Sequence, residues 1–227
     1  MSKILALDTS TDACSVALSV DGAVREDFRI IPRQHTQQLL PMVEAMLAEA
    51  DLSVSSLDAI AFGRGPGSFA GIRIATGVAQ GLAYGADLPV LPISTLEALA
   101  VAAAKKEGAA KVVTALDARM NEIYVASYAM KDGLPIAELS EQVSAPGALQ
   151  LQGEGYLAVG SGWRYIDDMP EETKRSVVVS SETYYPSSSA MLALATVAWG
   201  RGDAISPELA LPVYLRDEVA WKKKDQQ

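Results

Sequence analysis

The sequence predicts an α/β protein made of two lobes built on the same plan. The first observation is an internal repeat, in which an apolar run ends on an aspartate and is followed by a turn and a second apolar run. Two shorter matches follow in the same order, and the length of 227 residues accommodates two lobes of roughly 100 residues each. The matching segments are residues 4–8 and 113–117, 15–18 and 124–127, 57–63 and 155–160, and 88–90 and 211–213.

The first lobe, residues 1–108, is predicted to combine strands and helices. Asp21-Gly22 between two apolar runs is a strong indication of a β-hairpin. An apolar stripe at helical spacing predicts a helix over residues 36–50. The expected strands cover residues 4–8, 16–20, 23–31, 58–62 and 90–92, and the expected helices cover residues 36–50, 71–84 and 95–105.

The second lobe, residues 109–227, is predicted to repeat the hairpin and then to become loop-rich from residue 131 to residue 155. A helix near residues 187–200 and a last strand around residues 213–215 complete it. Two lobes of the βββαβα type, each opening with a strand, an aspartate, a turn and a strand, are typical of the duplicated actin/Hsp70/sugar-kinase (ASKHA) fold. The predicted fold class is therefore α/β of this duplicated type.

The charge balance limits the partners that this chain can hold by itself. Its net charge of −9 and pI near 4.7 argue against a broad phosphate-binding surface. The lysines at 222–224 come nearest to a basic patch and are interpreted as part of a solvated C-terminal tail. No apolar run is long enough for a signal peptide or a membrane span, so we expect a soluble, cytoplasmic protein.

The scarcity of cysteine and histidine excludes several classes of site. Cys14 is the only cysteine and lies in an apolar alternating run, which favours a small buried hydrophobe over a reactive thiol. His35 is the only histidine, so a multi-histidine metal site cannot form within one chain. A lone histidine just before a helix is typical of a capping or surface residue. Zinc hydrolases are thereby excluded.

The turn Asp8-Thr9-Ser10 is one candidate for a degenerate nucleotide or phosphate loop, and Asp117 ends the equivalent strand of the second lobe. In the ASKHA fold this turn faces the cleft and cradles phosphate through backbone N–H groups and hydroxyls, while the aspartate holds a metal or orients water. The alternative, which we favour for an isolated DTST motif, is an Asx-type turn whose hydrogen bonds satisfy only the turn itself.

A glycine-rich loop over residues 63–73 follows a predicted strand and opens a helix, a context in which a backbone can approach an anion. It lacks both the Gly-Lys-Ser/Thr ending of a Walker loop and the GxGxxG fingerprint. We interpret it as a rigid turn that requires positive φ, with Arg64 and Arg73 available for carboxylate or phosphate contacts. The loop residues that remain candidates for phosphate binding are Gly65, Gly67 and Ser68.

The helix after this loop is apolar nearly all round, and such a helix must be buried nearly all round. Its own sheet covers only one side. The helix over residues 36–50 covers the other side, or the two helices together present a surface to another protein, and the sequence favours neither alternative. The candidate contact residues are Leu39, Leu40, Val43, Met46, Leu47, Arg73, Thr76, Gly77, Gln80, Gly81 and Tyr84.

Five segments are spread from end to end of the chain: residues 5–11, 33–36, 63–73, 116–120 and 212–216, of which the loop with its GRGPGSF start and GIR end is the most specific. Together they resemble the TsaB (YeaZ) family. The resemblance implies a cytoplasmic protein required for threonylcarbamoyladenosine at position 37 of tRNAs that read codons starting with A. It also implies a partner of the catalytic subunit TsaD that works with the ATPase TsaE, forms a homodimer in isolation, and meets tRNA only through the complex.

The relative TsaD carries a metal-binding HxxxH motif, and this chain has Thr95 and Leu99 at those two positions. Neither side chain replaces an imidazole as a metal ligand. The resemblance therefore implies a chain without catalytic residues, metal or cofactor, with ATP or ADP bound only weakly or at the interface of the complex.

Two other functions stay open from the sequence. One is an ASKHA-type ATPase or phosphotransferase that uses Asp8, Thr9 and Asp117 around Mg-ATP. The other, ranked last, is a peptidase that depends on His35 and Ser68.

Overall fold

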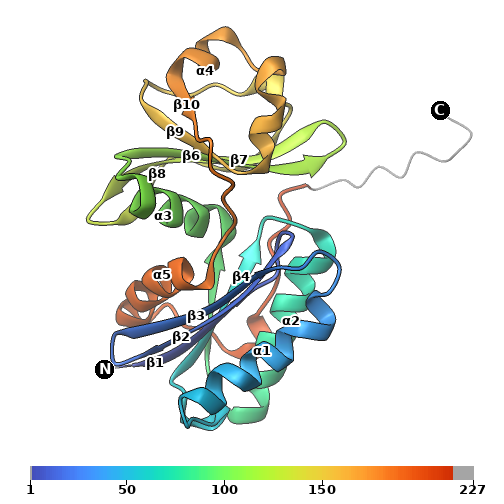
Figure 1. The fold of residues 1–227 in the computed structure, drawn as a ribbon, viewed down its shortest axis with the longest axis vertical. Helices are drawn as coiled ribbons and strands as arrows, with labels where there is room; N and C mark the ends of the chain where they lie inside the picture. Colours follow the sequence, from blue (N-terminus) through green and yellow to red (C-terminus); the bar gives the residue numbers. More distant parts are fainter. Residues whose placement is uncertain (1, 217–227) are drawn as a thin grey trace, which may run out of the picture.

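Two five-stranded mixed sheets form the two lobes of the computed structural model, which describes residues 2–216 (Figure 1). The first sheet has the order β3-β2-β1-β4-β5, and the second has the order β10-β9-β6-β7-β8. In each sheet the first three strands along the chain are antiparallel neighbours, and the first strand then pairs in parallel with the fourth. This repeated topology confirms the predicted duplicated ASKHA fold.

The strands and helices have the following bounds. The first sheet consists of β1 (Lys3–Asp8), β2 (Ala13–Val20), β3 (Ala23–Ile30), β4 (Ala59–Gly65) and β5 (Val90–Ser94). The second consists of β6 (Lys111–Arg119), β7 (Glu122–Lys131), β8 (Leu134–Ser144), β9 (Tyr156–Val159) and β10 (Val177–Val179). The α-helices are α1 (His35–Glu49), α2 (Phe69–Ala86), α3 (Thr95–Glu107), α4 (Glu171–Ser176) and α5 (Ser188–Arg201).

The central strands of the first sheet are buried on both faces, which explains their nearly continuous apolar sequence. Leu5 and Leu7 point to the face covered by α1 and α2, whereas Ile4 and Ala6 point to the face covered by α5. The helix predicted near residues 187–200 is confirmed as α5. It comes from the second half of the chain but packs on the first sheet (Figure 1).

The alanine-rich helix α3 lies between the lobes and has two buried faces. Ala98 and Val101 pack with α5 and the first sheet, while Leu96 and Leu99 pack on the second sheet. Alanine lets both faces approach closely, because it adds no side chain beyond Cβ. Along the chain, the expected division at residue 108 lies between β5 and β6, and it stays a prediction because α5 from the second half packs on the first sheet. Helices α3 and α5 form the junction that joins the two sheets.

Three features of the second lobe correct the sequence-based prediction. The segment expected to be loop-rich contains β8, an 11-residue strand at the sheet edge. The expected last strand at residues 213–215 is an extended segment instead, in which the backbone N–H of Val213 donates to the carbonyl of Arg64 over 2.8 Å. Helix α4 and strand β10 were not expected. The lysines at 222–224 lie outside the described residues.

No helix in residues 2–216 is long and apolar enough to cross a membrane.

Cys14 is fully buried in the first core, as its sequence context predicts, and its Sγ lies 3.7 Å from Sδ of Met42. Burial raises the pKa of the thiol to about 12, so almost no thiolate exists at neutral pH. We expect a thiol-specific reagent to label the folded chain only at the rate of unfolding. Stopped-flow labelling with and without denaturant measures this, and fast labelling under native conditions would contradict it.

Candidate functional site

The turn after β1 is an Asx turn that is closed from the inside. Asp8 is fully buried, and its Oδ1 accepts hydrogen bonds from the backbone N–H of Ser10 at 3.0 Å and from the Ser10 hydroxyl at 2.8 Å. Its Oδ2 is buried without a hydrogen-bond partner among the described residues. Burial raises the pKa of Asp8 to about 6, and the bonds from Ser10 oppose this rise.

The glycine-rich loop packs directly on this turn, backbone against backbone. Ser68 N–H donates to the carbonyl of Ser10 at 2.7 Å, and the Thr9 hydroxyl donates to the carbonyl of Gly71 at 2.6 Å. A Cβ added at Gly67 would lie 2.5 Å from the Ser10 carbonyl oxygen. The two candidate phosphate loops therefore fill the space between them, which counts against a phosphate held there.

The loop itself has the backbone that its sequence suggests. Gly65 has φ of +101°, which an L-residue with a side chain rarely adopts. The Ser68 hydroxyl caps α2 by accepting from the backbone N–H of Gly71 at 3.4 Å. Arg64 makes the expected carboxylate contact, with its guanidinium 3.0 Å from Glu141.

The equivalent turn of the second lobe is a tight hairpin. Arg119 pairs with Glu122, so only Met120 and Asn121 connect β6 to β7, and residues 119–121 all have positive φ. Asp117 is held by ion pairs to Arg119 at 3.5 Å and Arg164 at 3.4 Å. Because the hairpin leaves no open loop, this turn provides no phosphate loop equivalent to the turn after β1 within residues 2–216. This counts against the ATPase hypothesis.

The residues at the metal-ligand positions of TsaD, and the lone histidine, have structural partners. The Thr95 hydroxyl donates to the Pro66 carbonyl, and Leu99 is buried in the core of the second sheet. His35 is neither the surface residue nor the helix cap that was expected. It is buried as the first residue of α1, where Gln34 is the N-cap, and its Nε2 lies 3.2 Å from the Ala13 carbonyl oxygen. Within residues 2–216, no three His, Cys, Asp or Glu side chains cluster in a way that could hold a metal ion.

Most of the α1 residues predicted to contact a partner belong instead to the core of the first lobe. The exception is Leu40, whose side chain is 43% exposed. The apolar stripe of α1 is thus the face that it turns to its own sheet. The buried residues are Leu39, Val43, Met46 and Leu47.

Helix α2 does present an open face. Arg73, Gly77 and Gly81 are exposed, and Tyr84 is 69% exposed. Outside the helix's own backbone, no described atom lies within 4 Å of a Cβ built at Gly77 or Gly81. Of the other two candidates, Thr76 is buried and donates to the Ile72 carbonyl, and Gln80 is half-buried.

Sequence reasoning missed the segment that flanks this face. Residues 203–216, which we call the strap, run from the end of α5 along α2 and appear in red in Figure 1. Gln80 Nε2 donates to the Pro207 carbonyl at 2.9 Å, and Arg73 Nε donates to the Tyr214 hydroxyl at 2.7 Å. The Arg73 guanidinium also lies 3.7 Å from the centre of the Phe69 ring.

A stripe of residues at four-residue spacing could have revealed the exposed face of α2 from the sequence: Phe69, Arg73, Gly77, Gly81 and Gly85.

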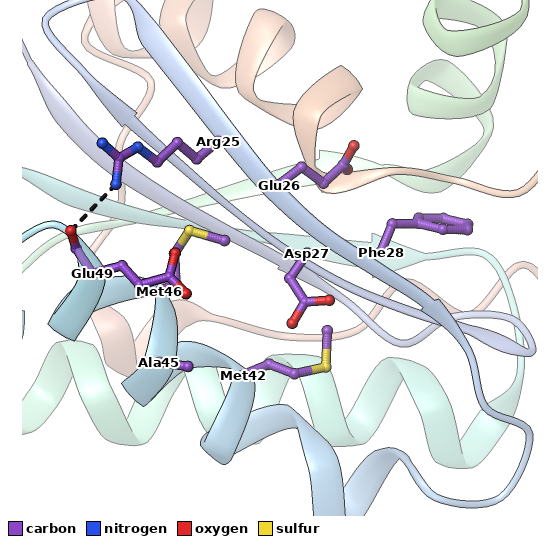
Figure 2. A pocket seen from close by; sticks show the side chains of 8 residues that line it. All are labelled: Arg25, Glu26, Asp27, Phe28, Met42, Ala45, Met46 and Glu49. Carbon is purple, nitrogen blue, oxygen red and sulfur yellow. Dashed lines mark hydrogen bonds between the residues drawn. The ribbon is translucent and has the colours of Figure 1, made fainter.

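Figure 2 shows a separate surface hollow between β3 and α1. Arg25 closes one end by donating to the Glu49 carbonyl at 3.3 Å. Charges of both signs form its rim, and two buried methionines form its floor. The lining contains no residue of either candidate phosphate loop and consists of Arg25, Glu26, Asp27, Phe28, Met42, Ala45, Met46 and Glu49.

Comparison with known proteins agrees with this arrangement. Residues 29–223 match the family model described as TsaD, tRNA N6-adenosine threonylcarbamoyltransferase. The "tRNA threonylcarbamoyladenosine biosynthesis protein TsaB" of Escherichia coli is 44% identical, with 97% of both chains covered. The protein of the same name from Haemophilus influenzae is also 44% identical, over 97% of this chain and 96% of the other. The chain belongs to the TsaB (YeaZ) family.

Solved structures extend this TsaB (YeaZ) assignment to the whole fold. The structure described as YeaZ from Pseudomonas aeruginosa is 45% identical and superimposes with a TM-score of 0.88, covering 95% of this chain and all of that one. A second Pseudomonas aeruginosa structure, described as similar to the peptidase YeaZ, gives a TM-score of 0.90. Both lobes therefore belong to the fold shared within the TsaB family.

Proposed function

We propose that this TsaB-family chain is the non-catalytic partner subunit of the machinery that transfers threonylcarbamoyl to adenosine 37 of tRNAs reading codons that start with A. It acts in the cytoplasm with a TsaD-like catalytic subunit and a TsaE-like ATPase, and it forms a homodimer when isolated. The names of its relatives support the pathway. The open face of α2 supports the role within it.

The exposed glycines of α2 carry the proposal. Gly77 and Gly81 stand in the middle of an 18-residue helix, where each glycine costs about 1 kcal/mol relative to alanine. Neither requires positive φ, and a methyl group at either position would meet no described atom outside the helix backbone. The isolated chain thus gains nothing from them. A second helix that packs closely against this face does gain, because glycine lets two backbones approach.

The residues around the glycines suit a protein interface. Arg73 and Tyr84 flank them, and arginine and tyrosine are among the residue types that contribute most to binding energy. Leu40 adds the one exposed member of the α1 set. A TsaD-like subunit and a second copy of the chain would use the same face, so the homodimer and the complex exclude each other.

The non-catalytic role is supported by the contacts of the turn after β1 and of the residues at the metal-ligand positions of TsaD. Asp8 and Thr9 are buried beneath the glycine-rich loop, and Thr95 and Leu99 have structural contacts where TsaD has metal ligands. ATP or ADP is then held weakly or at the junction with the partner. The catalytic groups and the tRNA-binding surface come from the complex.

We expect Gly81→Arg to weaken binding to the TsaD-type subunit at least about 100-fold, or about 3 kcal/mol, because the long side chain prevents close helix packing. Light scattering and titration calorimetry measure the complex, and growth of cells that depend on the variant measures function. Gly200→Arg is the matched control, since Gly200 is also an exposed glycine with open space around it, but on α5. Equal binding by the two variants would contradict the proposal.

A further inference from the structure

The second lobe contacts the α2 end of the first lobe through two polar tethers that lie apart from the α3–α5 junction. In Figure 1, α3 and α5 lie on one side of the molecule, and the strap runs from the end of α5 to the other side, beside α2. The junction is built from α3, α5 and the two sheets and is largely apolar. It also contains hydrogen bonds to Glu107 from Ser180 and Tyr184, and between Ser188 and Ser15. The tethers are built from charged and hydroxyl groups, so the two sides of the lobe contact differ in chemistry.

The first tether joins the glycine-rich loop to the edge strand of the second sheet. Glu141 on β8 uses both oxygens: Oε2 accepts from Arg64 at 3.0 Å, and Oε1 accepts from the Ser94 hydroxyl. Ser94 in turn caps α3 by accepting from the backbone N–H of Glu97 at 3.1 Å. The Arg64 and Glu141 side chains are only 24% and 16% exposed, so solvent screens this pair less than a surface pair.

The second tether is the strap. Val213 N–H donates to the Arg64 carbonyl at 2.8 Å, and the Tyr214 hydroxyl accepts from Arg73 at 2.7 Å. Arg216 then crosses to the second lobe, where its guanidinium donates to the Ala118 carbonyl at 3.1 Å and pairs with Glu122. Arg64 therefore takes part in both tethers: its side chain binds Glu141 on β8, and its backbone carbonyl accepts from the strap.

We infer that the Arg64–Glu141 pair and the strap act as a brace between the two lobes. The brace fixes the orientation of the second lobe relative to the first, and so relative to the exposed face of α2. Both tethers end on the loop that precedes α2 or on α2 itself. The largely apolar junction at α3 and α5 permits hinge motion where nothing else opposes it, because apolar contacts are not directional. The tethers supply directional contacts at the other side. This gives the second lobe a role although it forms no phosphate loop.

Distance measurements between spin labels test this in the full chain. Cysteines introduced at Ser55 in the first lobe and Glu172 in the second carry the labels, since both positions are exposed and Cys14 is buried. Labelled protein is diluted into unlabelled protein to suppress distances between copies. The double variant Arg64→Met, Arg216→Met is expected to widen the distance distribution at least about twofold, because hinge motion is then limited only by the α3–α5 junction.

A matched control breaks an ion pair that lies within the second lobe. Lys111→Met removes the ion pair with Glu138, which has a separation of 3.4 Å and is partly exposed, much like the Arg64–Glu141 pair. This variant is expected to leave the distance distribution unchanged. The charge swap Arg64→Glu with Glu141→Arg is expected to restore a narrow distribution relative to Arg64→Glu alone. If the double variant folds poorly, this charge swap tests the brace in its place.

Equal widths for the wild type and the tether variants would overturn the brace, and so would a failure of the charge swap to narrow the distribution. Neither result bears on the partner face, since the Gly81→Arg experiment measures that separately. The brace and the proposed function can therefore fail independently.

Discussion

Gly71→Ala is expected to destabilise the chain by about 3 kcal/mol or more, even though alanine is the better helix former. A Cβ at this position would lie 1.9 Å from the carbonyl oxygen of Thr9, which no rotamer change can relieve because both groups are backbone-fixed. The glycine-rich loop would have to move off the Asp8 turn. The hydrogen bonds from Thr9 to Gly71 and from Ser68 to Ser10 would then be lost.

Gly77→Ala, only six residues further along the same helix, is the matched control. Here the added methyl group meets open space, so helix propensity alone acts and the variant should gain about 0.5–1 kcal/mol. Urea unfolding followed by circular dichroism measures both changes on one scale. If Gly71→Ala were as stable as Gly77→Ala, the loop and the turn could not be in the contact described here.

This pair of glycines shows what the sequence can and cannot predict. The run of glycines at residues 63–71 predicts a special backbone, but not which glycine needs positive φ and which needs space. Only Gly65 has positive φ, whereas Gly67 and Gly71 are required because a turn more than fifty residues earlier lies against them. Such a contact depends on tertiary packing, and no local pattern encodes it.

The same limit explains the outcome for α1 and β8. An apolar stripe predicts that α1 is buried on one side, but not whether its own sheet or a partner covers that side, and here its own sheet does. Strand β8 has no apolar alternation because it lies at a sheet edge with many exposed residues, so its sequence resembles a loop. By contrast, the buried strands, the Asp21-Gly22 hairpin and the long helices follow from local pattern and were predicted.

Asp8 is the other place where local pattern and tertiary structure diverge. The sequence favours an Asx turn, and the contacts to Ser10 confirm one. The turn uses only Oδ1, however, and the structure places Oδ2 against Gly63, where a Cβ would lie 1.9 Å away. A buried carboxylate with one unpaired oxygen is destabilising when charged, because burial removes its hydration without a full replacement. Stability alone therefore does not require an ionisable side chain here.

Asp8→Asn is accordingly expected to stabilise the chain at neutral and alkaline pH. The asparagine keeps the oxygen that accepts from Ser10 but cannot ionise. In the wild type the pKa is raised from 3.8 in the unfolded state to about 6 in the folded state, so the folded form binds the proton more tightly. The stabilisation from protonated Asp8 is complete below pH 4 and is lost as pH rises through 6. This rise in pKa corresponds to about 3 kcal/mol of unfolding free energy.

The measurement is the free energy of unfolding of both proteins from pH 4 to pH 8. All other groups titrate alike in the two chains, so the difference between them isolates Asp8. That difference should grow in favour of Asp8→Asn between pH 4 and about pH 7 and then level off. Asp8→Ala, which removes the Asx acceptor as well, should show the same pH dependence displaced towards lower stability. A difference that stays constant with pH would mean that the charged carboxylate is not disfavoured in the folded chain, and that an ion or a water reaches Oδ2 at the end of β1.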